Sequence, residues 1–155
     1  MYDKILVPLD GSEFAERVIP RIEPLAEKLG SALVLLQVTT AIETLIAEIT
    51  PGIAGSGGVA VDPTPIMEAE QASAAEYLDA LAVRLRAKGF KVEVDHPTGR
   101  AARAIIESAR VHGADLIAMT THGRSGLGRM VFGSVAEEVL RHALCPVLVV
   151  RLSEP

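Results

Sequence analysis

A stretch rich in glycine and arginine, from Thr120 to Ser134, is the part of the sequence best suited to binding an anion. Glycines let backbone N–H groups approach an anion closely, and the start of a helix adds positive potential. Ser134 and Glu137 match a capping-box pattern and predict that a helix begins there. The stretch is therefore either a phosphate cradle or a glycine-rich connection before an ordinary capped helix, and the residues alone favour neither.

Asp10 is the second candidate, because it places a carboxylate directly after the apolar run 4–9. Its side chain can fix a turn with Gly11 or cap the following helix. It can also accept a hydrogen bond from a sugar hydroxyl or a base amine of a ligand. A place beside a phosphate is disfavoured, because like charges repel there unless a metal ion intervenes.

Short apolar runs typical of strands alternate along the chain with longer amphipathic patterns typical of helices. We predict strands at 4–9, 32–38, 90–95, 114–120 and 146–151. We predict helices at 12–29, 64–89, 100–112 and 134–143, with Thr64 as an N-cap. Pro20 and Pro24 predict a kink or a late start in the first helix.

Helices between successive strands imply right-handed crossovers and a parallel sheet covered on both faces. We therefore predict an α/β fold with an open, doubly wound, five-stranded parallel sheet, formed by residues 1–155 as a single domain. Ligands of such sheets bind outside the carboxyl ends of the strands. This rule selects the segments 8–12, 38–40, 97–99 and 119–134, so Asp10 and the glycine-rich stretch are expected at one edge of the sheet.

Composition excludes several classes of protein. The 155 residues are 49% hydrophobic and 23% charged, with a net charge of −5, whereas nucleic-acid-binding faces are basic. We expect no membrane partner, because the longest apolar runs are too short to cross a bilayer. Cys145 is the only cysteine, which excludes an internal disulfide. The absence of a signal-peptide pattern leads us to expect a cytoplasmic protein.

The sequence resembles the universal stress protein family over nearly its whole length. The likeness lies in five segments: 5–12 (ILVPLDGS), 113–119 (GADLIAM), 121–126 (THGRSG), 133–137 (GSVAE) and 145–150 (CPVLVV). In this order the segments are jointly specific. The resemblance implies the strand order 3-2-1-4-5.

Many members of that family bind ATP through the pattern G-x2-G-x9-G-[ST]. Gly123, Gly133 and Ser134 match its last three elements, whereas Thr120 stands in place of the first glycine. The resemblance implies that Asp10 contacts the adenosine part, that Val38 meets adenine through its backbone, and that ATP carries Mg²⁺ or Mn²⁺ held by its phosphates. The implied binding residues are Pro8, Leu9, Asp10, Val38, Met119, Thr120, Gly123, Arg124, Gly133, Ser134 and Val135.

The implied function is that of an ATP-binding regulator in a stress response, without catalytic residues. One alternative is a slow ATP hydrolase or nucleotidyl-transfer relative that uses the same cleft. Another is a member that binds no nucleotide and acts through protein contacts, which Thr120 favours.

The apolar strand predicted at 146–151 indicates that two copies of the chain associate. An apolar strand at the sheet edge leaves unpaired backbone groups beside an exposed apolar surface, and a two-fold partner would cover both. The resembled family often forms dimers in this way, so we expect a homodimer through residues 146–151.

Overall fold

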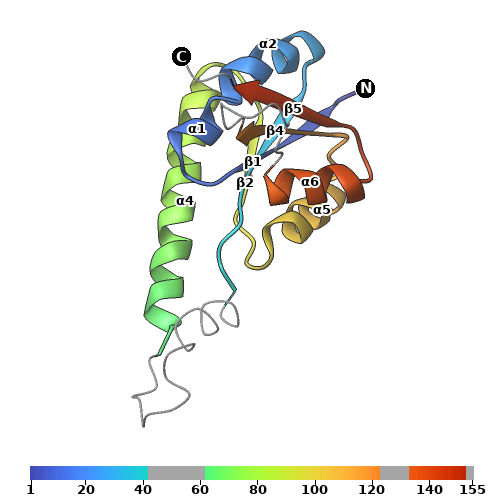
Figure 1. Cartoon of the computed structure of the whole chain (residues 1–155). Coiled ribbons are helices and arrows are strands. Elements are labelled where there is room, and N and C mark those ends of the chain that lie inside the picture. Colours follow the sequence, from blue (N-terminus) through green and yellow to red (C-terminus); the bar gives the residue numbers. More distant parts are fainter. Residues whose placement is uncertain (42–61, 123–132, 153–155) are drawn as a thin grey trace.

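Five parallel strands form the central sheet, in the order β3-β2-β1-β4-β5 (Figure 1). The computed structural model describes residues 1–41, 62–122 and 133–152. The strands are β1 (Lys4–Leu9), β2 (Ala32–Gln37), β3 (Val92–Asp95), β4 (Leu116–His122) and β5 (Val147–Leu152). The predicted α/β class and strand order are confirmed.

Helices cover both faces of this sheet (Figure 1). Helices α1 (Glu13–Glu16), α2 (Ile19–Leu29) and α4 (Thr64–Ala87) lie on one face, and α5 (Ala101–His112) and α6 (Ser134–His142) lie on the other. None of the helices in the described ranges is long and apolar enough to span a membrane.

The core is split by the sheet into two layers, as alternation along the strands requires. In β1, Ile5 and Val7 pack towards α2 and α4, whereas Leu6 packs towards α5 and α6. All three side chains are fully buried. Burial on both faces explains why the inner strands read as nearly continuous apolar runs.

The first predicted helix is interrupted, as its prolines suggest. Helix α1 ends at Glu16, and α2 begins only at Ile19. Pro20 lies in the first turn of α2, where its missing N–H has no intrahelical partner to lose. Pro24 lies inside α2, yet the helix continues to Leu29. Gly30 ends it in a left-handed conformation, at φ 69°.

Two predicted caps are wrong. Helix α4 has Pro63 as its N-cap, and Asp62 Oδ1 accepts a hydrogen bond from the backbone N–H of Thr64 at 3.0 Å. Thr64 is therefore the first helical residue. Helix α6 has Gly133 as its N-cap with no side-chain cap. Its Glu137 forms an ion pair with Arg141, at 2.8 Å, instead of completing a capping box.

Strand β4 reaches two residues beyond its predicted end, because its pairing with β5 continues there. Thr121 pairs with Arg151, and His122 with Leu152. Strand β3 starts at Val92 rather than at residue 90.

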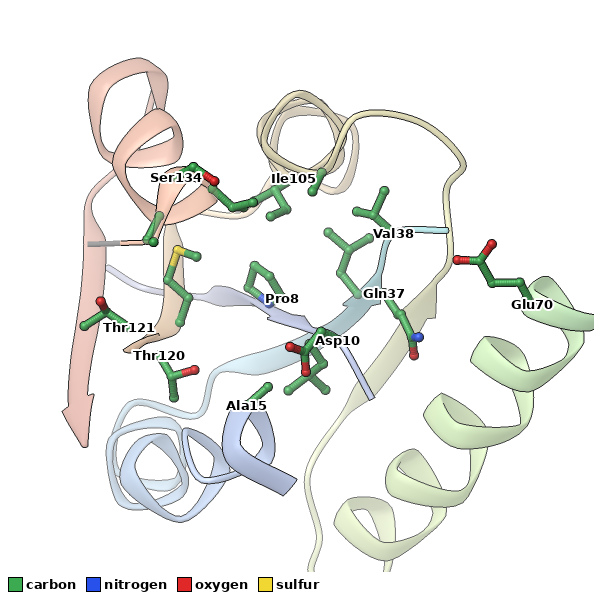
Figure 2. A pocket seen from close by; sticks show the side chains of 17 residues that line it. Pro8, Asp10, Ala15, Gln37, Val38, Glu70, Ile105, Thr120, Thr121 and Ser134 are labelled. Atoms are coloured by element: carbon green, nitrogen blue, oxygen red, sulfur yellow. The ribbon is translucent and has the colours of Figure 1, made fainter. Parts of the chain in front are cut away.

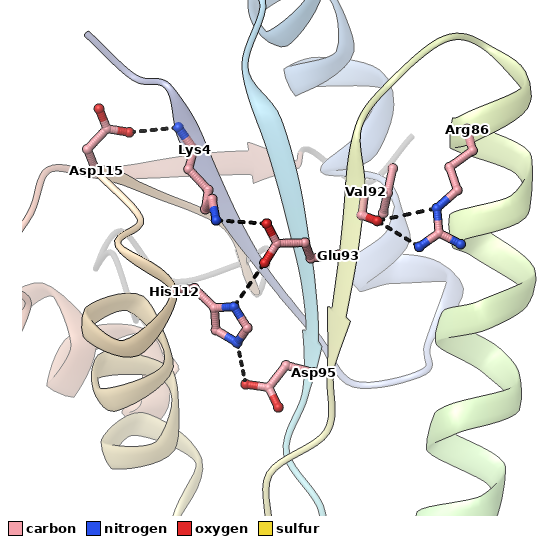
Figure 3. Close-up of polar contacts among 7 residues, drawn as sticks. All are labelled: Lys4, Arg86, Val92, Glu93, Asp95, His112 and Asp115. Carbon is pink, nitrogen blue, oxygen red and sulfur yellow. Dashed lines mark hydrogen bonds and ion pairs between the residues drawn. The ribbon is translucent and has the colours of Figure 1, made fainter.

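A polar cluster ties strand β3 to β1 and α5 (Figure 3). Lys4 Nζ donates to Glu93 Oε1 at 2.7 Å, and His112 places its two ring nitrogens 3.1 Å from Glu93 Oε2 and 3.0 Å from Asp95 Oδ2. The hydrogen bond from Lys4 is the main cause that lowers the pKa of Glu93, with His112 adding to it. The cluster anchors the short edge strand to its neighbours.

Candidate functional site

A cavity of about 380 Å³ lies at the carboxyl ends of β1, β2 and β4 (Figure 2). Strands β1 and β4 are neighbours in the sheet, and the strand order reverses between them. Open α/β sheets bind their ligands at such a switch point. The described residues that line the cavity are Pro8, Leu9, Asp10, Ala15, Leu36, Gln37, Val38, Glu70, Ala101, Ile105, Met119, Thr120, Thr121, Gly133, Ser134, Val135 and Ala136.

The cavity brings together those predicted binding residues that the structure describes. They are Pro8, Leu9, Asp10, Val38, Met119, Thr120, Gly133, Ser134 and Val135. Gly123 and Arg124 lie outside the described residues. The segment 97–99 does not line the cavity in the described part of its wall. The roles of these residues towards a ligand stay predictions.

The wall on the side of α5 is apolar. Val38 follows β2 and Ile105 comes from α5 (Figure 2). Met119 comes from β4. Ile105 and Met119 are almost fully buried, at 3% and 6% exposure, so the neighbouring core holds them in place. An apolar wall of this kind suits a flat aromatic ring, because ligand pockets are lined mainly by apolar side chains with a few polar groups.

Asp10 forms a tight turn between β1 and α1. Its Oδ1 accepts hydrogen bonds from the backbone N–H of Ser12 at 2.9 Å and from Ser12 Oγ at 2.5 Å. Gly11 has a φ of 80°, a conformation that favours glycine. Ser12, rather than Asp10, caps α1 by accepting from the N–H of Ala15 at 3.1 Å. Asp10 therefore fixes the turn while its exposed carboxyl group lines the cavity.

The N-terminus of α6 borders the cavity on the opposite side of Figure 2 from Glu70. Its N-cap is Gly133, so among the described residues no N-cap side chain satisfies the N–H groups of the first turn. A Cβ added to Gly133 would meet no described atom within 4 Å. Ser134 contributes a hydroxyl at the same place. Free N–H groups and the helix dipole make such an end attractive to an anion.

Two polar residues of the cavity wall, Gln37 and Glu70, lie outside the predicted ligand-binding segments, whereas Thr121 lies within the segment 119–134. Glu70 projects from α4, and its Oε1 accepts from the backbone N–H and from the hydroxyl of Thr40, both at 3.1 Å. Its position in the middle of an amphipathic stretch gave no signal. Gln37 could have been noticed, because it is the one polar residue in the run 32–38.

Cys145, His96, His112 and His142 do not line the described part of this cavity. Cys145 is partly buried, and burial raises the pKa of its thiol, so it is a packed small residue. His112 belongs to the cluster at β3. Within the described ranges, no group of three or more His, Cys, Asp or Glu side chains could hold a metal ion.

Comparisons with known proteins agree with this architecture. The model of the universal stress protein family matches residues 1–151. Universal stress protein Sll1388 of Synechocystis is 30% identical over 152 residues, which cover 97% of this chain and 98% of the relative.

Solved structures share the fold. The structure of protein MJ0577 of Methanocaldococcus jannaschii superimposes with a TM-score of 0.78 at 27% identity, and covers 100% of this chain and 99% of the other. A universal stress protein solved in complex with cAMP has a TM-score of 0.67 at 23% identity, and covers 98% of both chains. With a family match along almost its full length, the chain belongs to the universal stress protein family.

Proposed function

We propose that the protein binds ATP in the cavity at the switch point, with Mg²⁺ held through the phosphates, and that binding serves regulation in a stress response. One observation carries the proposal. A single cavity joins an apolar wall, which suits a base, to an uncapped helix N-terminus, which suits phosphates. The universal stress protein solved with cAMP shows that a member of the family binds an adenine nucleotide.

The adenine ring would lie against Val38, Ile105 and Met119. Two of these side chains are anchored in the core, so the slot is preformed and little ordering is needed on binding. Asp10 would accept a hydrogen bond from the adenosine part, because its carboxyl group lines the cavity beside the end of β1.

The phosphates would lie at Gly133, Ser134 and Val135. The first-turn N–H groups of α6 are donors, and the Ser134 hydroxyl adds another. Thr120 stands where the family pattern has glycine, and it offers a hydroxyl to the same cavity. Mg²⁺ would supply charge neutralisation between the phosphates, while the protein positions the nucleotide through these groups.

The hydrogen bonds that the cavity carboxylates make within the protein favour nucleotide binding without hydrolysis. Asp10 and Glu70 are the carboxylates of the described cavity wall, and each holds a local turn or loop by accepting two hydrogen bonds. A slow hydrolase remains the alternative function. Single-turnover measurements with labelled ATP separate the two, because a regulator releases ATP unchanged.

Titration calorimetry of nucleotide-free protein with ATP and Mg²⁺ tests the proposal. We expect one saturable site per chain, with AMP and cAMP titrated in parallel to rank the ligands. If none of the three nucleotides binds, the protein acts through protein contacts instead.

We also propose a homodimer through residues 146–151. Strand β5 is an edge strand that pairs only with β4 in the described sheet. Leu144 and Leu148, next to and within β5, are 86% and 37% exposed. A second copy would cover these side chains and the free edge together.

A further inference from the structure

Gln37 brings a polar side chain to the cavity from the last position of β2. It pairs with Leu9 of β1, so it lies beside the turn that Asp10 forms. Side chains alternate along a strand. Leu36 packs with α5, and Gln37 therefore points to the face that carries α4. Figure 2 shows the Gln37 amide on that side, near Asp10 and towards Glu70.

The carbonyl oxygen of Gln37 is buried, and no described residue donates a hydrogen bond to it. Buried polar side-chain atoms nearly always have a partner. A Cβ on Gly11 would lie 3.6 Å from Nε2 and 3.8 Å from Oε1 of Gln37. Gly11 therefore lies beside the amide at ordinary van der Waals distance and offers no side-chain donor to it. Gln37 lines the cavity, and its terminal amide torsion has a broad range, so a rotation of the amide can bring Oε1 to a ligand that supplies the missing donor.

The groups around Gln37 determine which part of a ligand can donate a hydrogen bond to its Oε1. Asp10 Oδ1 already accepts from Ser12, and Glu70 Oε1 already accepts from Thr40. This side of the cavity presents carboxylate and amide oxygens, which repel a phosphate and attract a group that donates. In a nucleotide the ribose hydroxyls lie between base and phosphates, and they can donate here.

We infer that Gln37 determines specificity for ribonucleotides over deoxyribonucleotides, with its Oε1 accepting a hydrogen bond from a ribose hydroxyl. The inference rests on the proposed function, because it assumes that the cavity binds a nucleotide. It assigns a role to a residue that neither the sequence pattern nor the family motif includes.

Calorimetry with ATP, 2′-deoxy-ATP and 3′-deoxy-ATP, each with Mg²⁺, tests this role. The wild type binds one of the deoxy analogues about 5- to 20-fold more weakly than ATP, the range expected for one hydrogen bond to a buried acceptor. Gln37→Met has similar length but no acceptor. It binds ATP as weakly as the wild type binds that analogue, and it no longer distinguishes the two.

Gln71→Met is the matched control, because Gln71 donates to Thr98 at 3.0 Å outside the cavity wall. It retains the wild-type preference. Thermal melting checks that each variant folds, and Gln37→Leu replaces Gln37→Met if that variant does not.

The possible failures are distinguishable. A wild type that binds ATP and both deoxy analogues equally overturns the role of Gln37 and leaves nucleotide binding intact. A Gln37 variant that keeps the preference does the same. A wild type that binds none of the three ligands overturns the proposed function, and the inference falls with it.

Discussion

Replacement of Gly133 by valine places a branched side chain at the N-cap of α6. The position has an ordinary φ of −56°, and an added Cβ meets no described atom within 4 Å. The new side chain would occupy cavity space instead of displacing the core. Valine is a poorer N-cap than glycine, so we expect a loss of only about 1 kcal/mol in the free energy of unfolding.

The effect on binding is expected to be larger. Phosphates at Gly133 and Ser134 would receive charge-assisted hydrogen bonds from the first turn of α6. Loss of one such bond costs about 1.5–3 kcal/mol. That corresponds to about 10- to 150-fold in the Kd for ATP. Adenosine has no phosphate and should lose much less.

Calorimetry with ATP and with adenosine measures both effects, and circular dichroism checks the fold. Gly133→Ala is the graded control, because its smaller side chain should weaken ATP binding less than valine does. Unchanged ATP affinity in a folded Gly133→Val variant would refute the placement of the phosphates. An equal loss for ATP and adenosine would show that valine blocks the whole cavity.

Three further perturbations test other parts of the molecule. Asp10→Ala should weaken ATP, AMP and adenosine alike, and a calorimetric loss confined to ATP would place Asp10 at the terminal phosphates instead. Val149→Lys should convert a dimer into a monomer in sedimentation while one ATP site per chain remains; a wild type that is monomeric at high concentration would contradict the dimer. Because Lys4 lowers the pKa of Glu93, Glu93→Gln should cost at most about 1 kcal/mol at neutral pH. That difference in the free energy of unfolding should vanish as the pH falls through the folded-state pKa, and a difference that persists in acid would contradict the ion pair.

Strong local patterns predicted the elements of the fold well, and failures occurred at their ends. The capping-box pattern at Ser134 and Glu137 predicts Ser134 as the N-cap. In the structure Gly133 is the N-cap, and Ser134 is the first residue of the helix. The hydroxyl of Ser134 therefore faces the cavity, where it is available to a ligand. Strand β4 continues to His122 because β5 pairs with it, and no local pattern encodes that partner.

The residues of the candidate site also differ in whether the sequence predicts them. Asp10 and Gly133 follow or precede recognisable elements, so sequence position alone placed them at the right edge of the sheet. Glu70 reaches the cavity only because α4 packs against β2 and β3, with Thr40 holding its carboxylate. Such a long-range contact cannot be read from the amphipathic pattern of a helix.

A crystal structure of the protein grown with ATP and Mg²⁺ tests nucleotide binding at the switch point most directly. We predict adenine against Val38, Ile105 and Met119, with the phosphates at the N–H groups that follow Gly133. A nucleotide bound elsewhere on the molecule, or an empty cavity at saturating ATP, would contradict the proposed site.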